Sequence, residues 1–178
     1  MSPQTTLAQL PVGQIGFGAM RITGPGIWGP PRDEGEAIAL LRRAVEKGVT
    51  FIDTADSYGP GISETLIAKA LHPYPAGLVV ATKGGLVRPG ADRWVTDCRP
   101  EHLRRACADS LQRLRLECIE VYQLHAVDHR IPIEDFDRCT RQSSAGGQDP
   151  PYRRIERLRE GACPSTRRSL DRLRPEPL

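Results

Sequence analysis

The sequence predicts an α/β fold of parallel βα units, taken as about the first four units of a (β/α)8 barrel. Two observations predict it. Apolar stretches alternate with amphipathic segments at intervals of roughly 30–40 residues, the pattern of parallel strands joined by helices. The apolar stretches end in polar groups, as barrel strands do at the rim that carries catalytic residues. A complete barrel usually needs about 250 residues, so the 178 residues of this chain supply roughly half of one.

The order of the residues predicts four strands and three helices. The strands are expected at 14–20, 49–53, 78–83 and 119–125. Asp33, with Glu36 three residues later, is expected to cap the first helix, which stops at Gly48. Ser63 is expected to cap the second helix, and Pro100 to take the first position of the third. The segment between the third strand and the third helix is expected to be a loop. No GxGxxG motif follows a strand, which argues against a Rossmann module.

The composition is that of an ordinary globular protein, with 39% hydrophobic and 26% charged residues. The N-terminus, MSPQTTLAQL, lacks the basic and long apolar regions of a signal peptide. No apolar run approaches the roughly 20 residues needed to span a bilayer. The sequence therefore predicts a cytoplasmic protein with no membrane partner.

The cysteines give no sign of a metal site or a disulfide framework. They are odd in number, scattered, and never form CxxC. We expect buried or incidental thiols and no bound metal. The five are Cys98, Cys107, Cys118, Cys139 and Cys163.

The chain divides in charge and composition near residue 135. Residues 1–135 hold 15 basic and 16 acidic residues, a net charge of −1. Residues 136–178 hold 10 arginines, no lysine and 6 acidic residues, a net charge of +4. This second segment is rich in Arg, Pro, Gly and Ser and has few periodic apolar residues, which is typical of disorder. The sequence predicts one domain in 1–135 and a disordered tail in 136–178.

Four side chains at the expected strand ends form a coherent chemical set: Asp53, Tyr58, Lys83 and His125. Barrel geometry brings such positions to one face. A neighbouring ammonium lowers the pKa of a phenol, so Lys83 would tune Tyr58 as a general acid, with Asp53 holding Lys83 charged. Taken singly, each has a plainer interpretation: a capped turn, a solvated strand end, a core histidine. Their occurrence on successive strand ends favours a catalytic site.

The motifs GFGAM, FIDTADSYG, ATKGG and YQLH occur in this order within about residues 10–135 and resemble the aldo-keto reductase family. That resemblance implies a (β/α)8 enzyme that reduces aldehydes or ketones to alcohols with NADPH. It also implies a small carbonyl substrate and no obligate protein partner. The segments GPGIWGPP and HPYP resemble a bacterial branch of small aldehyde and ketone reductases that includes pyridoxal-reductase-like members.

The resemblance also implies a role for each site residue. Tyr58 would donate the proton, Lys83 and Asp53 would lower its pKa, and His125 would position the carbonyl. The positions that match those against the nicotinamide ribose are Gly18, Ala19, Met20 and Asp53. Trp28 would line the substrate mouth, with surface packing as the alternative.

The family pattern stops after residue 135. Read from the second base of each codon, the tail can encode SIGAL, GKIRHIGVS and VQNRYN, in that order, and these strings resemble the family's next helix, fifth strand and sixth strand. We hypothesise that one extra nucleotide near codon 135 or 136 puts the rest of the gene out of frame. The expected consequence is a half-barrel with negligible reductase activity. Sequencing codons 130–145 in independent isolates tests this hypothesis.

Two other functions fit parts of the sequence. A non-catalytic relative that binds a nicotinamide nucleotide would keep the fold, although the intact set of four residues argues against it. A nucleic-acid-binding protein would use the arginines of 136–178 to contact phosphates. A shifted reading frame of a GC-rich gene produces the same composition, so we expect no nucleic-acid partner.

Overall fold

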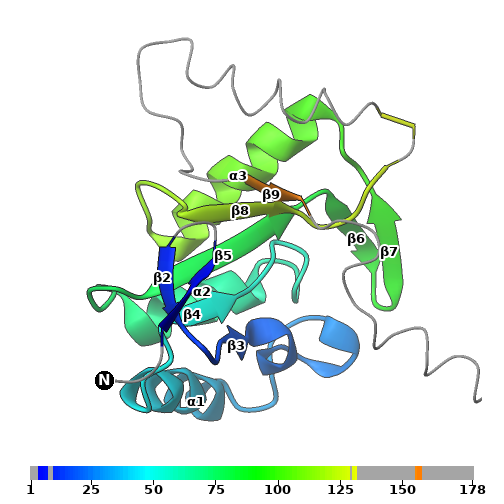
Figure 1. The fold of residues 1–178 in the computed structure, drawn as a ribbon. Helices are drawn as coiled ribbons and strands as arrows, with labels where there is room; N and C mark the ends of the chain where they lie inside the picture. The colour runs from blue at the N-terminus through cyan, green and yellow to red at the C-terminus, as the bar shows by residue number, and fades with distance from the viewer. Residues whose placement is uncertain (1–3, 8–9, 129, 132–154, 158–178) are drawn as a thin grey trace, which may run out of the picture.

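The computed structural model describes residues 4–7, 10–128, 130–131 and 155–157, and its centre is a five-stranded parallel sheet (Figure 1). The strand order is β3-β4-β5-β8-β9. All pairs in this sheet are parallel. The strands are β3 (Phe17–Gly18), β4 (Phe51–Asp53), β5 (Val79–Gly84), β8 (Val121–Leu124) and β9 (Ile155–Arg157). The first four coincide with the four strands that the sequence predicts.

Three helices cross between the strands: α1 (Glu34–Glu46), α2 (Ile62–Leu71) and α3 (Pro100–Leu114). The largest core cluster lies between these helices and the sheet, with Leu41 of α1, Leu66 and Ile67 of α2, and Ile52 and Val80 of the strands. Every residue of β5 and β8 is buried. Burial on both faces is what parallel strands covered by crossover helices require. This core places the carboxyl ends of the strands at one rim.

An N-terminal hairpin, which the sequence did not predict, covers the sheet at the end where β5 and β8 begin. Its strands are β1 (Gln4–Leu7) and β2 (Leu10–Gly13), paired antiparallel. Val12 packs there against Val79, Ala81 and Val121. The hairpin thus closes the end of the sheet away from the polar rim.

A second hairpin replaces the loop expected between the third strand and the third helix. β6 (Leu86–Gly90) and β7 (Arg93–Thr96) pair antiparallel around a turn at Asp92, whose φ is 57°. The expectation of a loop here is therefore wrong. Alternation is weak in this segment, and Arg88 ties the hairpin to carbonyls 31 or more residues away.

The helix starts agree with the sequence in two cases and differ in one. The Asp33 side chain accepts a hydrogen bond from the Glu36 amide at 2.9 Å, so the predicted cap of α1 is confirmed. Pro100 opens α3 as predicted. The predicted Ser63 cap is wrong: α2 begins at Ile62, and the buried Ser63 hydroxyl lies 2.7 Å from the hydroxyl of Thr54 instead. A tertiary partner has taken the hydroxyl that a local motif would assign to the cap.

The tail contributes one strand to the sheet. Ile155 pairs with Tyr122 and Arg157 with Leu124, in parallel register. The expectation of disorder throughout 136–178 is wrong for these three residues. The remainder of 136–178 lies outside the described residues, as do Cys139 and Cys163.

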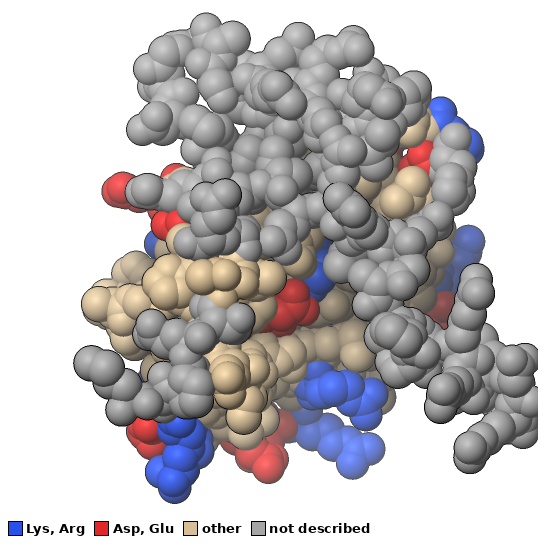
Figure 2. Space-filling view, viewed as in Figure 1, with Lys and Arg blue, Asp and Glu red and all other residues tan. Residues whose placement is uncertain are grey.

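The β3 edge of the sheet carries exposed apolar side chains. Ile15 is 74% exposed, Met20 37% and Leu40, on α1, 49%. A groove of about 710 Å3 lies beside them, lined in part by Phe17 and Ile22. Among the described residues, Figure 2 shows mostly uncharged atoms across the middle of this view around an acidic side chain, with charged side chains gathered along its lower edge. None of the helices in the described part of the chain has the length and hydropathy of a membrane span.

Candidate active site

The buried lysine at the end of β5 anchors the candidate site. Lys83 Nζ lies 2.7 Å from Asp53 Oδ2, at the end of the neighbouring strand β4. The same ammonium donates to the Thr54 carbonyl oxygen at 2.8 Å. In the parallel register Asp53 pairs with Ala81, two residues before Lys83. The Lys83 side chain therefore extends back toward the neighbouring strand to reach the carboxylate. Burial lowers the pKa of Lys83, and the Asp53 carboxylate opposes that effect.

Tyr58 lies with its ring facing the Lys83 ammonium, on the loop between β4 and α2. The Lys83 ammonium is 5.2 Å from the centroid of the Tyr58 ring. The ring is 6% exposed. Gly59 and Gly61, at φ values of 83° and 75°, turn the chain after the tyrosine into α2. The three residues Asp53, Tyr58 and Lys83 are therefore brought together as the sequence predicts.

The pKa of the Tyr58 phenol is shifted in the opposite direction to the one the sequence predicts. Burial, together with smaller effects of the Asp53 and Asp56 carboxylates, raises the pKa of Tyr58 to about 12. The ammonium of Lys83 is compensated by Asp53 and by a carbonyl, so its positive charge does not dominate at the phenol. The prediction that Lys83 and Asp53 lower this pKa is wrong for the protein without cofactor. Tyr58 is fully protonated at neutral pH.

His125 follows β8 and faces the tyrosine. Its ring meets the Tyr58 ring edge to face, with centroids 5.5 Å apart. Ser57 Oγ lies 3.1 Å from His125 Nδ1. Burial, with a smaller effect of Lys83, lowers the pKa of His125 to about 4, so the imidazole is neutral at pH 7. The fourth predicted residue thus joins the other three.

A second carboxyl group next to the site was missed in the sequence. Asp56 lies two residues before Tyr58, and its Oδ1 is buried without a hydrogen-bond partner among the described residues. Burial and the nearby Glu64 carboxylate raise the pKa of Asp56 to about 7. Asp56 is visible in the motif FIDTADSYG beside Asp53. Only the structure shows that Asp56 Oδ1 is buried without a hydrogen-bond partner in the described part of the chain, whereas Asp53 is paired with Lys83.

The positions expected to meet a nicotinamide ribose lie where β3 ends. A side chain added at Gly18 would meet open space. Met20 is 37% exposed at the same rim, whereas Ala19 is fully buried and its carbonyl accepts from the Ser63 hydroxyl at 3.1 Å. The Asp53 side chain keeps 35% of its surface exposed and presents a carboxylate that a ribose hydroxyl would fit. The open rim and this acceptor suit the nicotinamide end of the cofactor.

Trp28 and the hairpin β6–β7 form one side of the rim. Trp28 makes a parallel bridge with Gly59, directly after the tyrosine. Trp94, on β7, meets the His125 ring at a centroid distance of 6.4 Å. Arg88 lies between the two indoles. Sequence reasoning placed Trp28 near the mouth but missed Trp94, Arg88 and Ser57, whose contacts to other segments of the rim are long-range.

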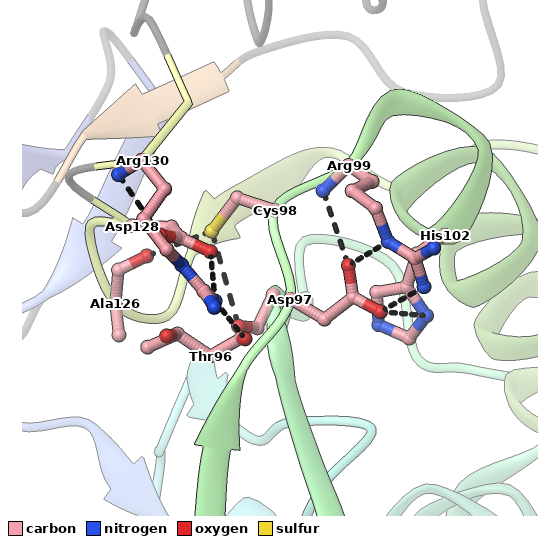
Figure 3. A network of polar contacts seen from close by, with 9 residues as sticks. Thr96, Asp97, Cys98, Arg99, His102, Ala126, Asp128 and Arg130 are labelled. Carbon is pink, nitrogen blue, oxygen red and sulfur yellow. Dashed lines mark hydrogen bonds and ion pairs between the residues drawn. The ribbon is translucent and has the colours of Figure 1, made fainter.

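The segment that follows His125 is tied to the end of β7 and the residues before α3 by a polar network (Figure 3). Arg130 donates to both carboxylate oxygens of Asp128 at 2.8 Å and to the Thr96 carbonyl at 3.3 Å. The Cys98 thiol donates to the Ala126 carbonyl at 3.2 Å. These bonds fix the loop after β8 against the end of β7. Among the described residues, no group of three His, Cys, Asp or Glu side chains is arranged to hold a metal ion.

The model of the aldo/keto reductase family matches residues 14–146. The chain belongs to the aldo/keto reductase family. Its parallel sheet and crossover helices are the corresponding part of the (β/α)8 barrel. The match begins before the GFGAM motif and includes all four residues of the candidate site.

Similar proteins share the described half. An uncharacterized oxidoreductase of Schizosaccharomyces pombe is 49% identical over 124 residues, which are 70% of this chain and 40% of the relative. Pyridoxine 4-dehydrogenase of Escherichia coli is 41% identical over 128 residues, 71% of this chain and 45% of the relative. The chain thus spans less than half the length of these two relatives.

Solved structures match more of this chain, over about half of their own length. An aldo-keto reductase from Bacillus halodurans, in its holo form, matches with a TM-score of 0.73 and 28% identity, over 89% of this chain and 51% of that chain. An aldo-keto reductase from Klebsiella pneumoniae in complex with NADPH matches with a TM-score of 0.67 and 25% identity, over 88% of this chain and 49% of that chain.

Proposed function

We propose that this reductase site converts aldehydes or ketones to alcohols with NADPH. The observation that carries the proposal is the convergence of a protonated phenol, a neutral imidazole and a buried ammonium–carboxylate pair at one rim. Tyr58 lies 5.5 Å from His125 between ring centroids, and the Lys83 ammonium lies 5.2 Å from the Tyr58 ring. Membership of an oxidoreductase family and the NADPH complex of the Klebsiella pneumoniae neighbour support the cofactor.

The bound nicotinamide would supply the hydride. Gly18, Met20 and Asp53 are the residues that would hold its ribose, because Gly18 pairs with Asp53 at the strand ends, space is open at Gly18, and Met20 and Asp53 are partly exposed. The Asp53 carboxylate would then serve two partners, the Lys83 ammonium at 2.7 Å and a ribose hydroxyl. Ala19, which is fully buried, would support this rim without touching the ribose.

Tyr58 would donate the proton to the carbonyl oxygen. Its pKa of about 12 keeps the phenol protonated at every physiological pH. A phenol of this pKa is a weak acid, yet the alkoxide that develops on the substrate is a stronger base, so the transfer is downhill. The Lys83 ammonium beneath the ring would stabilise the phenolate that remains.

His125 would orient the substrate as a hydrogen-bond donor. Its pKa of about 4 makes the imidazole neutral, so only one ring nitrogen carries a proton. The 3.1 Å contact between Ser57 Oγ and His125 Nδ1 fits either direction; in the tautomer proposed here the Ser57 hydroxyl donates to Nδ1, and the Nε2 proton would donate to the carbonyl oxygen. Two donors, Tyr58 and His125, would then meet at one oxygen, as a developing oxyanion requires.

The relative named pyridoxine 4-dehydrogenase, at 41% identity, favours pyridoxal as the first substrate to test. A nitrobenzaldehyde is the second, as a reactive aromatic aldehyde.

We also propose that the chain of 178 residues has negligible activity by itself. The apolar β3 edge is open, and the described rim offers groups for the nicotinamide end of the cofactor alone.

A fusion separates these two proposals. Residues 1–131 are joined to the carboxyl-terminal half of the Schizosaccharomyces pombe oxidoreductase, which is 49% identical over the shared part. We expect NADPH-dependent pyridoxal reduction by the fusion, and a loss of about 100-fold or more on Tyr58→Phe. A folded fusion that binds NADPH but reduces neither aldehyde would refute the reductase proposal and favour a non-catalytic nucleotide-binding relative. Equal activity of the unfused chain would refute the proposed inactivity.

A further inference from the structure

Arg88 is a buried arginine whose guanidinium joins three segments of the rim. The residue is 8% exposed and lies on β6. Its Nη1 donates to the Ile27 carbonyl at 3.0 Å and to the Ser57 carbonyl at 3.4 Å. Its Nη2 donates to the Gly26 carbonyl at 3.1 Å, and its Nε to the Arg93 carbonyl at 3.1 Å. One side chain therefore holds the loop before Trp28, the loop before Tyr58 and the hairpin β6–β7.

The flat face of the same guanidinium packs on aromatic rings. Its central carbon is 3.6 Å from the centroid of the Trp94 ring and 5.5 Å from that of Trp28. The edge of the group is used for hydrogen bonds and the face for stacking, which is a combination only arginine offers. No carboxylate forms an ion pair with Arg88 among the described residues, so its partners are carbonyls and rings.

Two of the residues that Arg88 contacts, Ser57 and Trp94, also adjoin His125. The Ser57 carbonyl accepts from Arg88, while the Ser57 hydroxyl lies 3.1 Å from His125 Nδ1. Trp94 stacks on Arg88 and meets the His125 ring edge to face at 6.4 Å. A shift of Arg88 would therefore move the hydrogen-bond partner and the ring neighbour of His125 together.

We propose that Arg88 is a positioning residue that assembles the substrate mouth and orients His125 through Ser57 and Trp94. The structural part of this inference stands by itself, and its catalytic consequence rests on the proposed reductase function. The side chain does not touch the reacting atoms. Its role is to hold the two tryptophans and the Ser57 loop at fixed positions around the imidazole.

The chain has two tryptophans, Trp28 and Trp94, and both contact Arg88, so intrinsic fluorescence reports on this contact without any cofactor. Arg88→Lys keeps the charge but removes the fork and the flat face. We expect a red-shifted emission and an acrylamide quenching constant raised about twofold, because both indoles lose the group that covers them. Arg93→Lys is the matched control on the same hairpin: its side chain is exposed, and the variant should match the unmodified protein.

Unchanged emission and quenching in a folded Arg88→Lys variant would overturn the proposal. Loss of its native circular dichroism would also overturn it, because Arg88 would then be a folding residue. The unmodified protein provides a second measurement by NMR. The Arg88 Nε–H, which donates to a carbonyl, should exchange slowly near pH 7, whereas the exposed Arg93 side chain should exchange fast. Fast exchange at Arg88 contradicts the inference.

The catalytic consequence is measured in the active fusion described above. Arg88→Lys should lower kcat/KM for pyridoxal by about tenfold through misorientation of the carbonyl. The pH dependence set by Tyr58 should stay unchanged, because Arg88 is not a proton donor in the reaction. If the fusion has no activity, the fluorescence result still tests the positioning role of Arg88. Failure of the proposed reductase function is therefore distinguished from failure of the Arg88 proposal.

Discussion

Removal of the Asp53 carboxylate should leave a buried ammonium without its counter-charge. The Lys83 side chain is 7% exposed, and its ammonium bonds to Asp53 at 2.7 Å and to the Thr54 carbonyl at 2.8 Å. Breaking a buried ion pair by deleting one partner costs about 3–5 kcal/mol. We expect a loss near the lower end for Asp53→Ala, about 3 kcal/mol, since the Thr54 bond remains and Asp53 is itself 35% exposed.

The loss should depend on pH in a defined direction. Burial already lowers the pKa of Lys83 below that of an unfolded lysine, and loss of the Asp53 carboxylate, which opposes that effect, lowers it further. The folded variant then binds fewer protons than the unfolded chain between the two pKa values. Its free energy of unfolding should therefore rise with pH up to about 10. The penalty at pH 9.5 should be smaller than at pH 7.

The chain contains its own control. Lys69 and Glu34 form an ion pair at 2.6 Å, but their side chains are 45% and 47% exposed. Glu34→Ala should cost about 0.5 kcal/mol or less, with no comparable pH dependence. Urea unfolding followed by circular dichroism at pH 7 and 9.5 gives both values. Replacing Lys83 by Met together with Asp53 by Leu should recover most of the lost stability, because it leaves no charge buried.

Equal losses for Asp53→Ala and Glu34→Ala would refute the reasoning, since the two pairs differ in burial and hardly in distance. A pH-independent loss in Asp53→Ala would also count against it. That result would mean that Lys83 reaches water or another partner in the variant and never sits unpaired in the site.

Three further predictions follow from local geometry. Asp33→Ala removes the bond to the Glu36 amide and should cost about 1 kcal/mol in urea unfolding, while Asp33→Ser should restore most of it. Gly59→Ala should cost about 2 kcal/mol or more, because its φ is 83° and the added carbon would lie 2.5 Å from a side chain of α2. Gly29→Ala, at φ 67° with open space around it, should cost only about 1 kcal/mol; equal costs would contradict the steric account. His125 should show no NMR titration between pH 5 and 8, because its pKa is about 4. Its neutral form should contribute stability that is lost as pH falls from about 6.5 through 4, and a titration near 6.5 would contradict the burial of the ring.

The sequence by itself determined the parallel βα order and the strand ends that carry the site. Asp53 and Lys83 follow apolar runs, and such runs must become buried parallel strands whose ends meet at one rim. The Asp33 cap was equally readable, because its donor lies three residues away. Features set by neighbours in sequence were thus predictable.

Only the tertiary structure decided the features that depend on distant partners. Ser63 has the sequence of a cap but bonds to Thr54 and to a backbone carbonyl 44 residues away. The β6–β7 hairpin is held by Arg88 across 31 and more residues. The pKa of Tyr58 follows from burial, which no spacing reveals, and burial reversed the direction expected from Lys83 alone. The sequence identifies which side chains lie at the rim, whereas desolvation and long-range hydrogen bonds set their charge states and positions.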